Sequence, residues 1–315
     1  MNASSQSFSF VFACPRCGLS LEAQGAGCLR CSCDSRTYAC LEGIWRFLVP
    51  EKAAELERFI REYESVRRDE GWWDGDSAEY YKALPFLDLT GRFRRIWKIR
   101  ARSCRTIEDD VIAPLSRAAG RPLRILDLGA GNCWFSNRLA QRGHAVAAVD
   151  LLVNRHDGLG ARVWYGAAAG FLVCQATFDR LPFAGDQADV AIFNGAFHYS
   201  SAYDVTLAEA MRVLRSDGRV IIMDSPFYEE AASGKRGVDE RESRFERRYG
   251  FRGDAVACEG YLTPRRLDEL TANTRLQWRL VWPRSGPLSE WRRRLRQILL
   301  RREPARFPVI VGQIG

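Results

Sequence analysis

Short apolar segments separated by longer amphipathic ones constrain the fold of this chain more than any other feature. They cover residues 123–128, 145–149, 171–176, 190–193 and 220–223. Apolar runs that alternate with helical patterns are typical of parallel strands whose connecting helices cover both faces of one sheet. The sequence therefore predicts a doubly wound α/β sheet. Ligands of such sheets bind where the strands end at their carboxyl side.

Glycines and carboxylates stand where the first two predicted strands end. The first strand runs into Asp127-Leu-Gly129-Ala-Gly131, and such glycines let a ligand approach the backbone closely. The second strand ends at Asp150, where a carboxylate can accept hydrogen bonds from both hydroxyls of a ribose. This combination predicts a nucleoside-containing cofactor. A dinucleotide fingerprint would need a third glycine where the sequence has Trp134, which disfavours NAD.

Four segments resemble the class I S-adenosylmethionine-dependent methyltransferases, and the resemblance covers residues 121–315. These segments are 126–131, 146–150, 179–193 and 213–224. The resemblance implies a seven-stranded Rossmann-like sheet, with a sixth parallel strand at 276–282 and an antiparallel seventh at 307–314.

The same resemblance implies which residues contact S-adenosylmethionine. They are Asp127, Gly129, Gly131, Asn132, Asp150, Phe178, Asp179 and Asn194. The sequence departs from the family pattern at Cys133, where a third glycine is frequent. The contact to adenine stays open between Thr177, Phe178 and Asp179.

Polar residues after the fourth predicted strand are candidates for catalysis. Asn194, His198 and Tyr199 should lie at the sheet edge that faces the transferred methyl group. The titration range of His198 suits a general base. The alternative is that His198 only orients the cofactor or a neighbouring loop.

Six cysteines fall within the first forty residues. Cys14 and Cys17 form one C-x2-C pair, and Cys28 and Cys31 form another, each of which could place two thiolates on one tetrahedral ion. We therefore expect a structural four-cysteine zinc ribbon in residues 1–50, with Cys33 as a competitor of Cys31. The alternative is a set of ordinary buried or disulfide-forming cysteines.

The remaining organisation follows from charge and helical periodicity. Residues 51–120 predict a helical connector that covers the active site, and residues 227–261 predict a lid insert in the domain 121–315. The net charge of +8 is concentrated in residues 91–105 and in a basic insert, 288–303. These arginines could contact an anionic acceptor, RNA or, for 288–303, a membrane surface, or they could simply be solvated.

The chain has no membrane-spanning run or signal peptide, so we expect a cytoplasmic protein.

We therefore predict an S-adenosylmethionine-dependent methyltransferase that acts on a small-molecule or lipid acceptor. A zinc ribbon before such a domain is also similar to ribosomal-RNA guanine-N1 methyltransferases, which makes RNA the alternative acceptor. The nearly neutral charge of the zinc region favours the small molecule. A further alternative is a non-catalytic zinc-ribbon binding protein on a methyltransferase scaffold.

Overall fold

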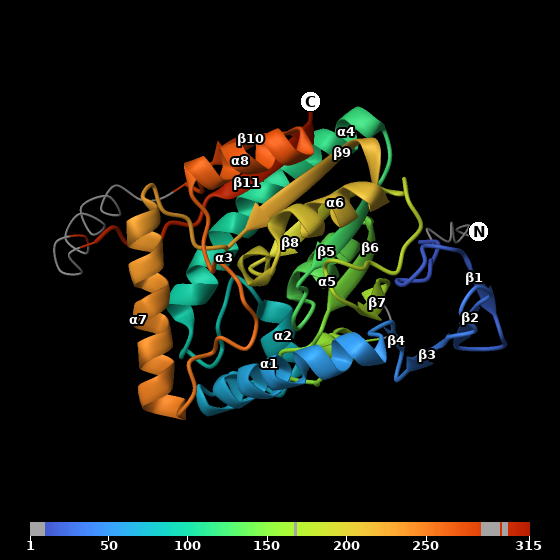
Figure 1. Ribbon diagram of the computed structural model, residues 1–315, viewed down its shortest axis with the longest axis horizontal. Helices are drawn as coiled ribbons and strands as arrows, with labels where there is room; N and C mark the ends of the chain where they lie inside the picture. Colours follow the sequence, from blue (N-terminus) through green and yellow to red (C-terminus); the bar gives the residue numbers. More distant parts are fainter. Residues whose placement is uncertain (1–9, 167–168, 285–296, 298–301) are drawn as a thin grey trace.

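A single mixed sheet with helices on both faces forms the centre of the molecule (Figure 1). The computed structural model describes residues 10–166, 169–284, 297 and 302–315. The strand order is β1-β2-β3-β4-β7-β6-β5-β8-β9-β11-β10. The seven strands predicted from the sequence are present as β5 (Arg124–Leu128), β6 (Ala145–Asp150), β7 (Leu172–Gln175), β8 (Ala188–Asn194), β9 (Leu214–Met223), β10 (Leu276–Val281) and β11 (Val309–Ile314).

Parallel pairing connects the strands at the centre of the sheet. Strand β5 pairs in parallel with both β6 and β8, and β11 runs antiparallel to β9 and β10, as expected for the last strand. Neighbouring residues of β5 point to opposite faces, so Ile125 and Leu126 belong to two different apolar clusters. Both clusters are covered by helices, which explains why the central strands read as continuous apolar runs.

The helices follow the predicted alternation. They are α1 (Pro50–Asp69), α2 (Ala78–Ala83), α3 (Arg94–Ile107), α4 (Ala113–Ala119), α5 (Trp134–Gln141), α6 (Tyr203–Val213), α7 (Ala231–Tyr249) and α8 (Pro264–Thr274). The start of α8 has a local cause, because the Thr263 hydroxyl accepts the N–H of Arg266 at 3.1 Å and Pro264 occupies the first turn.

The N-terminal strands correct the expectation of a separate ribbon beside a seven-stranded sheet. Strands β1 (Leu21–Ala23), β2 (Cys28–Cys31), β3 (Thr37–Leu41) and β4 (Ile44–Arg46) form an antiparallel ribbon. Strand β4 then pairs in parallel with β7, with Trp45 opposite Cys174, so the sheet has eleven strands in the described part of the chain. The physical reason is that β7 would otherwise present unpaired backbone groups at the sheet edge.

Aromatic side chains fill the junction between the ribbon and the sheet. The ring of Phe12 lies 4.9 Å from that of Phe47, and the ring of Phe10 lies 5.4 Å from that of Phe183. Phe47 is 1% exposed, and its N–H donates to the carbonyl of Gln175 at 2.9 Å. The ribbon is therefore part of the hydrophobic core.

Two sequence expectations concern the lid and the basic insert. The predicted lid, residues 227–261, contains α7 and the loop that follows it. The basic insert, residues 288–303, lies almost entirely outside the described residues. None of the helices in the described part of the chain combines the length and apolar character needed to cross a bilayer.

Replacing Phe47 by alanine tests the shared core. The variant Phe47→Ala should lower the free energy of unfolding by about 3 to 5 kcal/mol, because it leaves a cavity among packed rings. Urea denaturation followed by tryptophan fluorescence and by circular dichroism should still give one coincident transition. Leu41→Ala, at a side chain that is 55% exposed, is the control and should change stability little. Two separate transitions would show instead that the ribbon unfolds independently.

Candidate active site

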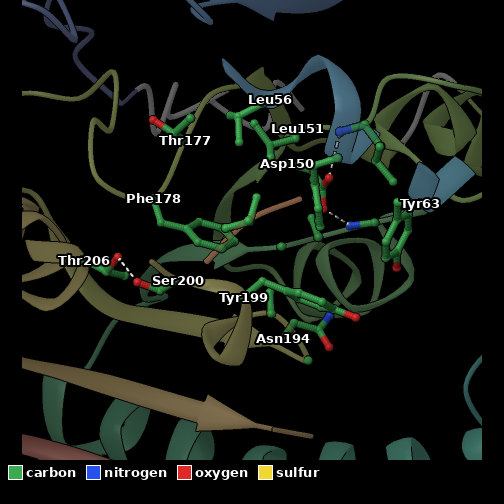
Figure 2. Close-up of a pocket in the computed structure, with 18 of the residues that line it drawn as sticks. Leu56, Tyr63, Asp150, Leu151, Thr177, Phe178, Asn194, Tyr199, Ser200 and Thr206 are labelled. Carbon is green, nitrogen blue, oxygen red and sulfur yellow. Dashed lines mark hydrogen bonds between the residues drawn. The ribbon is translucent and has the colours of Figure 1, made fainter. Parts of the chain in front are cut away.

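A cavity of about 300 Å³ lies at the carboxyl ends of β5, β6 and β8 (Figure 2). The structure brings most of the predicted site residues together in its wall. These are Gly129, Gly131, Asn132, Asp150, Phe178, Asp179, Asn194 and Tyr199, together with Thr177. Most residues for which we expected cofactor contacts therefore line one cavity.

The turn after β5 needs glycine for steric reasons. Gly129 has a φ of +76°, and a Cβ added there would lie 2.1 Å from the Cβ of Ala196. Cys133, the residue before α5, has a φ of +61°, in the left-handed region that favours glycine.

The Asp150 carboxylate ties this turn to the end of β6. Its Oδ2 accepts the N–H of Gly131 and its Oδ1 accepts the N–H of Leu152, both at 2.8 Å (Figure 2). Burial raises the pKa of Asp150 to about 6, although these hydrogen bonds oppose the shift. The carboxylate is therefore largely ionised at neutral pH, and each oxygen keeps a lone pair for a further donor.

Asp127 departs from the expected cofactor contact. This side chain is fully buried and is not among the residues that line the cavity. Its Oδ2 accepts the Ser136 hydroxyl at 2.6 Å, and burial raises its pKa to about 7. Asp127 thus holds α5 against the end of β5, behind the glycine turn.

His198 also lies outside the cavity, which disagrees with the role of general base expected for it. The imidazole is buried, and its Nδ1 lies 3.1 Å from the Ser225 hydroxyl. Burial, and then the nearby Arg241, lower the pKa of His198 to about 3. Residues 197–199 form a 3₁₀ turn, in which successive side chains point about 120° apart. That turn directs Tyr199 into the cavity and His198 away from it.

Helix α1 forms the roof of the cavity and contributes residues that the sequence did not single out. Leu56, Phe59 and Tyr63 line the cavity from this helix. The rings of Phe59 and Tyr63 contact Tyr199 edge-on, at 5.9 and 6.2 Å between centroids. Their helical spacing supported the prediction of a connector that covers the active site, but it did not show which of its residues line the cavity.

Two arginines reach the cavity from the connector, and they differ in their partners. Arg67 forms an ion pair with Asp157, whereas no carboxylate lies within ion-pair distance of Arg100 in the part of the chain that the structure describes. The Arg100 guanidinium lies 4.8 Å from the centre of the Trp97 ring. Burial, and then the neighbouring Arg67, lower the pKa of Arg100. Arg100 therefore brings a positive charge with unused donors to the cavity wall.

The predicted lid completes the wall. Residues 255–257, which follow α7, also line the cavity. Ion pairs hold this region to α1, with 3.0 Å between Arg58 and Asp254 and 2.7 Å between Arg248 and Asp69. The lid and the connector thus act as one cover.

The cysteine cluster differs from the predicted set of four metal ligands. The Sγ atoms of Cys14, Cys17 and Cys31 all lie within 4.8 Å of one another, and Cys28 is not in this group. Cys28 and Cys31 are the two ends of β2, and residues three apart on a strand point to opposite faces. Their C-x2-C spacing therefore belongs to a strand and not to a tight turn.

Comparison with known proteins agrees with the geometry of the cavity. Residues 126–222 match the family described as "Methyltransferase domain". Curated relatives include the malonyl-[acyl-carrier protein] O-methyltransferase of Geobacter sulfurreducens, 30% identical over 177 residues, which are 52% of this chain and 64% of the relative. The enzyme of that name from Gallionella capsiferriformans is 27% identical over 155 residues, 46% of this chain and 53% of the relative. The chain thus spans less than two thirds of each relative.

Solved structures with a similar course of the chain are more distant in sequence. The 1,6-didemethyltoxoflavin-N1-methyltransferase of Burkholderia thailandensis, with bound S-adenosylhomocysteine, gives a TM-score of 0.45 at 19% identity, covering 94% of this chain and 99% of that one. A putative sarcosine dimethylglycine methyltransferase of Galdieria sulphuraria gives 0.48 at 15% identity, covering 82% and 98%.

The family match covers the strands whose ends form the cavity. It includes the glycine turn, Asp150 and Asn194. Strand β11 is the antiparallel last strand that the resemblance implied. Residues 126–222 of this chain are therefore similar to a methyltransferase domain.

Proposed function

We propose that this protein transfers a methyl group from S-adenosylmethionine to a small-molecule acceptor that carries an anionic group. One observation carries the proposal: the residues suited to a nucleoside cofactor and the unpaired guanidinium of Arg100 line the same cavity. The cavity has the concave shape and mixed lining that are typical of small-molecule sites.

The residues of the cavity fit the cofactor. Asp150 offers its remaining lone pairs to the ribose hydroxyls, and the Gly129–Gly131 turn allows close backbone contact. Thr177, Phe178 and Asp179 remain the candidates for the adenine contact. When bound, S-adenosylmethionine supplies an electrophilic methyl group, so the task of the protein is to align the acceptor and to exclude water.

An anionic acceptor would account for the presence of Arg100 in the cavity wall. A guanidinium can bind a carboxylate through two parallel hydrogen bonds, and Arg100 has donors free for this. The names of the curated relatives combine a malonyl group, which ends in a carboxylate, with O-methyl transfer. A carboxylate is already ionised at neutral pH and needs no general base. This agrees with a cavity in which no described lining residue is a histidine.

We propose that Asn194 and Tyr199 position the acceptor. Both line the cavity beside the glycine turn, and the edge contacts of Phe59 and Tyr63 hold the ring of Tyr199. The apolar side chains of α1 would suit a lipid or an acyl chain attached to the anionic group. The described relatives give no support to RNA as the acceptor. The expected cofactor residues that line the cavity argue against a non-catalytic scaffold.

We further propose that Cys14, Cys17 and Cys31 hold a structural zinc ion. Cys17 and Cys31 have their Sγ atoms 3.5 Å apart, and all three thiols converge at one end of the ribbon. Three converging thiols suit zinc better than a disulfide, which joins only two.

Transfer of a labelled methyl group tests the function. Purified protein is incubated with S-[methyl-³H]-adenosylmethionine and either a malonyl thioester or a cell lysate separated into RNA, protein, lipid and small-molecule fractions. We expect label in the malonyl thioester or in an acidic member of the small-molecule or lipid fraction. Label confined to RNA, or to protein that carries no malonyl thioester, would contradict the proposed acceptor class, and label in no fraction would contradict the activity.

Substitution of Asp150 tests the cofactor contact. Asp150→Ala should weaken the binding of S-adenosylhomocysteine by about tenfold or more, because hydrogen bonds to a charged group are lost. Wild-type affinity should also fall as the pH drops below about 6, where Asp150 takes up a proton and loses acceptor capacity. Isothermal titration calorimetry measures both effects, with the exposed Asp109→Asn as control. Unchanged affinity in Asp150→Ala would overturn the assignment.

Substitution of Arg100 tests the anion site. Arg100→Met should raise the KM for the anionic acceptor by about tenfold, because a charge-assisted hydrogen bond is lost, and should leave the affinity for S-adenosylhomocysteine unchanged. Arg95→Met, at an exposed position of the same helix, is the control. Weakened cofactor affinity with an unchanged KM would show that Arg100 binds the carboxylate of the cofactor instead.

The protonation state of His198 can be measured directly. Its imidazole should stay neutral between pH 8 and pH 5, because burial lowers its pKa to about 3, well below the ordinary value of about 6.5. NMR spectra of the protein with ¹⁵N-labelled histidine follow the titration, and the spectrum of His198→Gln identifies the resonance. A midpoint between pH 6 and pH 7 would restore His198 as a candidate base.

A further inference from the structure

We infer that Asp34 is the fourth ligand of the metal site at Cys14, Cys17 and Cys31. The site would then have three thiolates and one carboxylate, in place of the four cysteines expected from the sequence. The inference rests on the proposed zinc ion and on the similarity of the two turns that carry its ligands.

Two turns of the ribbon have the same hydrogen-bond pattern. The N–H of Cys14 donates to the carbonyl of Leu19 at 2.8 Å, and the N–H of Cys31 donates to the carbonyl of Arg36 at 2.8 Å. Each turn thus begins at a cysteine of the cluster and closes five residues later. Cys17 and Asp34 both stand three residues after that cysteine.

The backbone N–H groups around the Sγ atoms of Cys14 and Cys31 are also arranged in the same way. The N–H groups of Arg16 and Cys17 are directed at the Sγ of Cys14. Those of Cys33 and Asp34 are directed at the Sγ of Cys31. Such N–H donors around a sulfur stabilise a thiolate ligand of a metal. In the second turn, Asp34 therefore occupies the position that the ligand Cys17 has in the first.

The Asp34 side chain has a lone pair available for a metal. The carboxylate contacts the Sγ of Cys31, and its Oδ1 accepts the N–H of Arg36 at 3.1 Å. Its Oδ2 is buried and has no hydrogen-bond partner, with the Nε of Arg36 3.6 Å away. A buried carboxylate oxygen without a hydrogen bond is unfavourable, and coordination of a cation would compensate for it.

The remaining cysteines of the ribbon are poorly placed for this role. Cys28 lies at the other end of β2 and on its opposite face, in register with Ala39. Cys33 is exposed, and it is the residue inside the turn whose N–H faces Cys31. Asp34 is thus the donor that the second turn supplies. Its carboxylate oxygens do not lie within 4.8 Å of all three thiol sulfurs, so the side chain must turn toward them when the ion binds.

The donor set suits zinc. Zinc binds cysteine sulfur at about 2.3 Å and aspartate oxygen at about 2.0 to 2.2 Å, in tetrahedral sites that are structural when four protein ligands fill them. The Tyr38 hydroxyl lies 3.2 Å from the Sγ of Cys14 and can donate to it as an outer partner. Both turns lie beside the start of α1, since Arg36 also pairs with Glu51 at 2.6 Å.

Metal content and cobalt spectra of the full-length protein test the inference. Wild type should contain about one zinc per chain, Asp34→Ala should lose most of it, and Cys28→Ser and Cys33→Ser should keep it. Asp34→Cys should keep the metal. After replacement of zinc by Co²⁺, its sulfur-to-cobalt absorption should be about one third stronger than in wild type, because four thiolates replace three.

Each other outcome contradicts a specific step. Full zinc in Asp34→Ala, or an unchanged cobalt spectrum in Asp34→Cys, would overturn Asp34 as a ligand while leaving the zinc proposal intact. Loss of zinc in Cys28→Ser or Cys33→Ser would assign the fourth position to that cysteine. Wild-type protein without bound metal, even after incubation with Zn²⁺, would overturn the zinc site itself. None of these measurements depends on methyl transfer.

Discussion

The parallel pairing of β5 with both β6 and β8 determines where the functional groups of this protein can lie. Parallel strands finish at the same edge of a sheet, so the residues that follow Leu128, Val149 and Phe193 must meet there. The glycine turn, Asp150 and Asn194 come together for this reason alone. The helices on both faces bury the strands and leave that edge as the place for a cavity.

The sequence predicted what depends on local patterns. Strand positions followed from apolar runs, and the Gly129 turn and Asp150 followed from their places at strand ends. The direction of side chains within a three-residue turn has no such signal, so the sequence could not separate His198 from Tyr199. The same limit applies to Asp127, whose full burial depends on how Ser136 of α5 packs behind it.

The pairing of strands that lie far apart in the chain could not be predicted from the sequence either. Nothing in residues 44–46 indicated that they would pair with β7, because strand pairing depends on which edge is free after the rest has folded. The C-x2-C spacing was ambiguous for a different reason. Cys14 and Cys17 flank a turn, whereas the same spacing in Cys28 and Cys31 spans a strand, and only the hydrogen-bond pattern tells the two apart.

Helix α1 links the charges of the ribbon with those of the active site. Near its start, Lys52 lies 3.5 Å from Asp179 at the cavity, while Glu51 pairs with Arg36 of the ribbon. Farther along, Arg67 is neutralised by Asp157, which leaves Arg100 as the cation without such a partner among the described residues of the wall. Residues of α1 thus form ion pairs with Asp179 and Asp157 at the cavity, and the positive charge of Arg100 stays available for a ligand.

The position of β4 beside β7 has a consequence for the behaviour of shorter forms of the protein. A fragment that begins after residue 50 would keep the cavity residues of the sheet but would uncover the backbone of β7 and the ring of Phe183, which is fully buried in the whole chain. An open strand edge next to an exposed aromatic surface favours association between copies and aggregation. The ribbon therefore contributes to the solubility of the methyltransferase domain by covering the side of the sheet on which copies could otherwise add to one another.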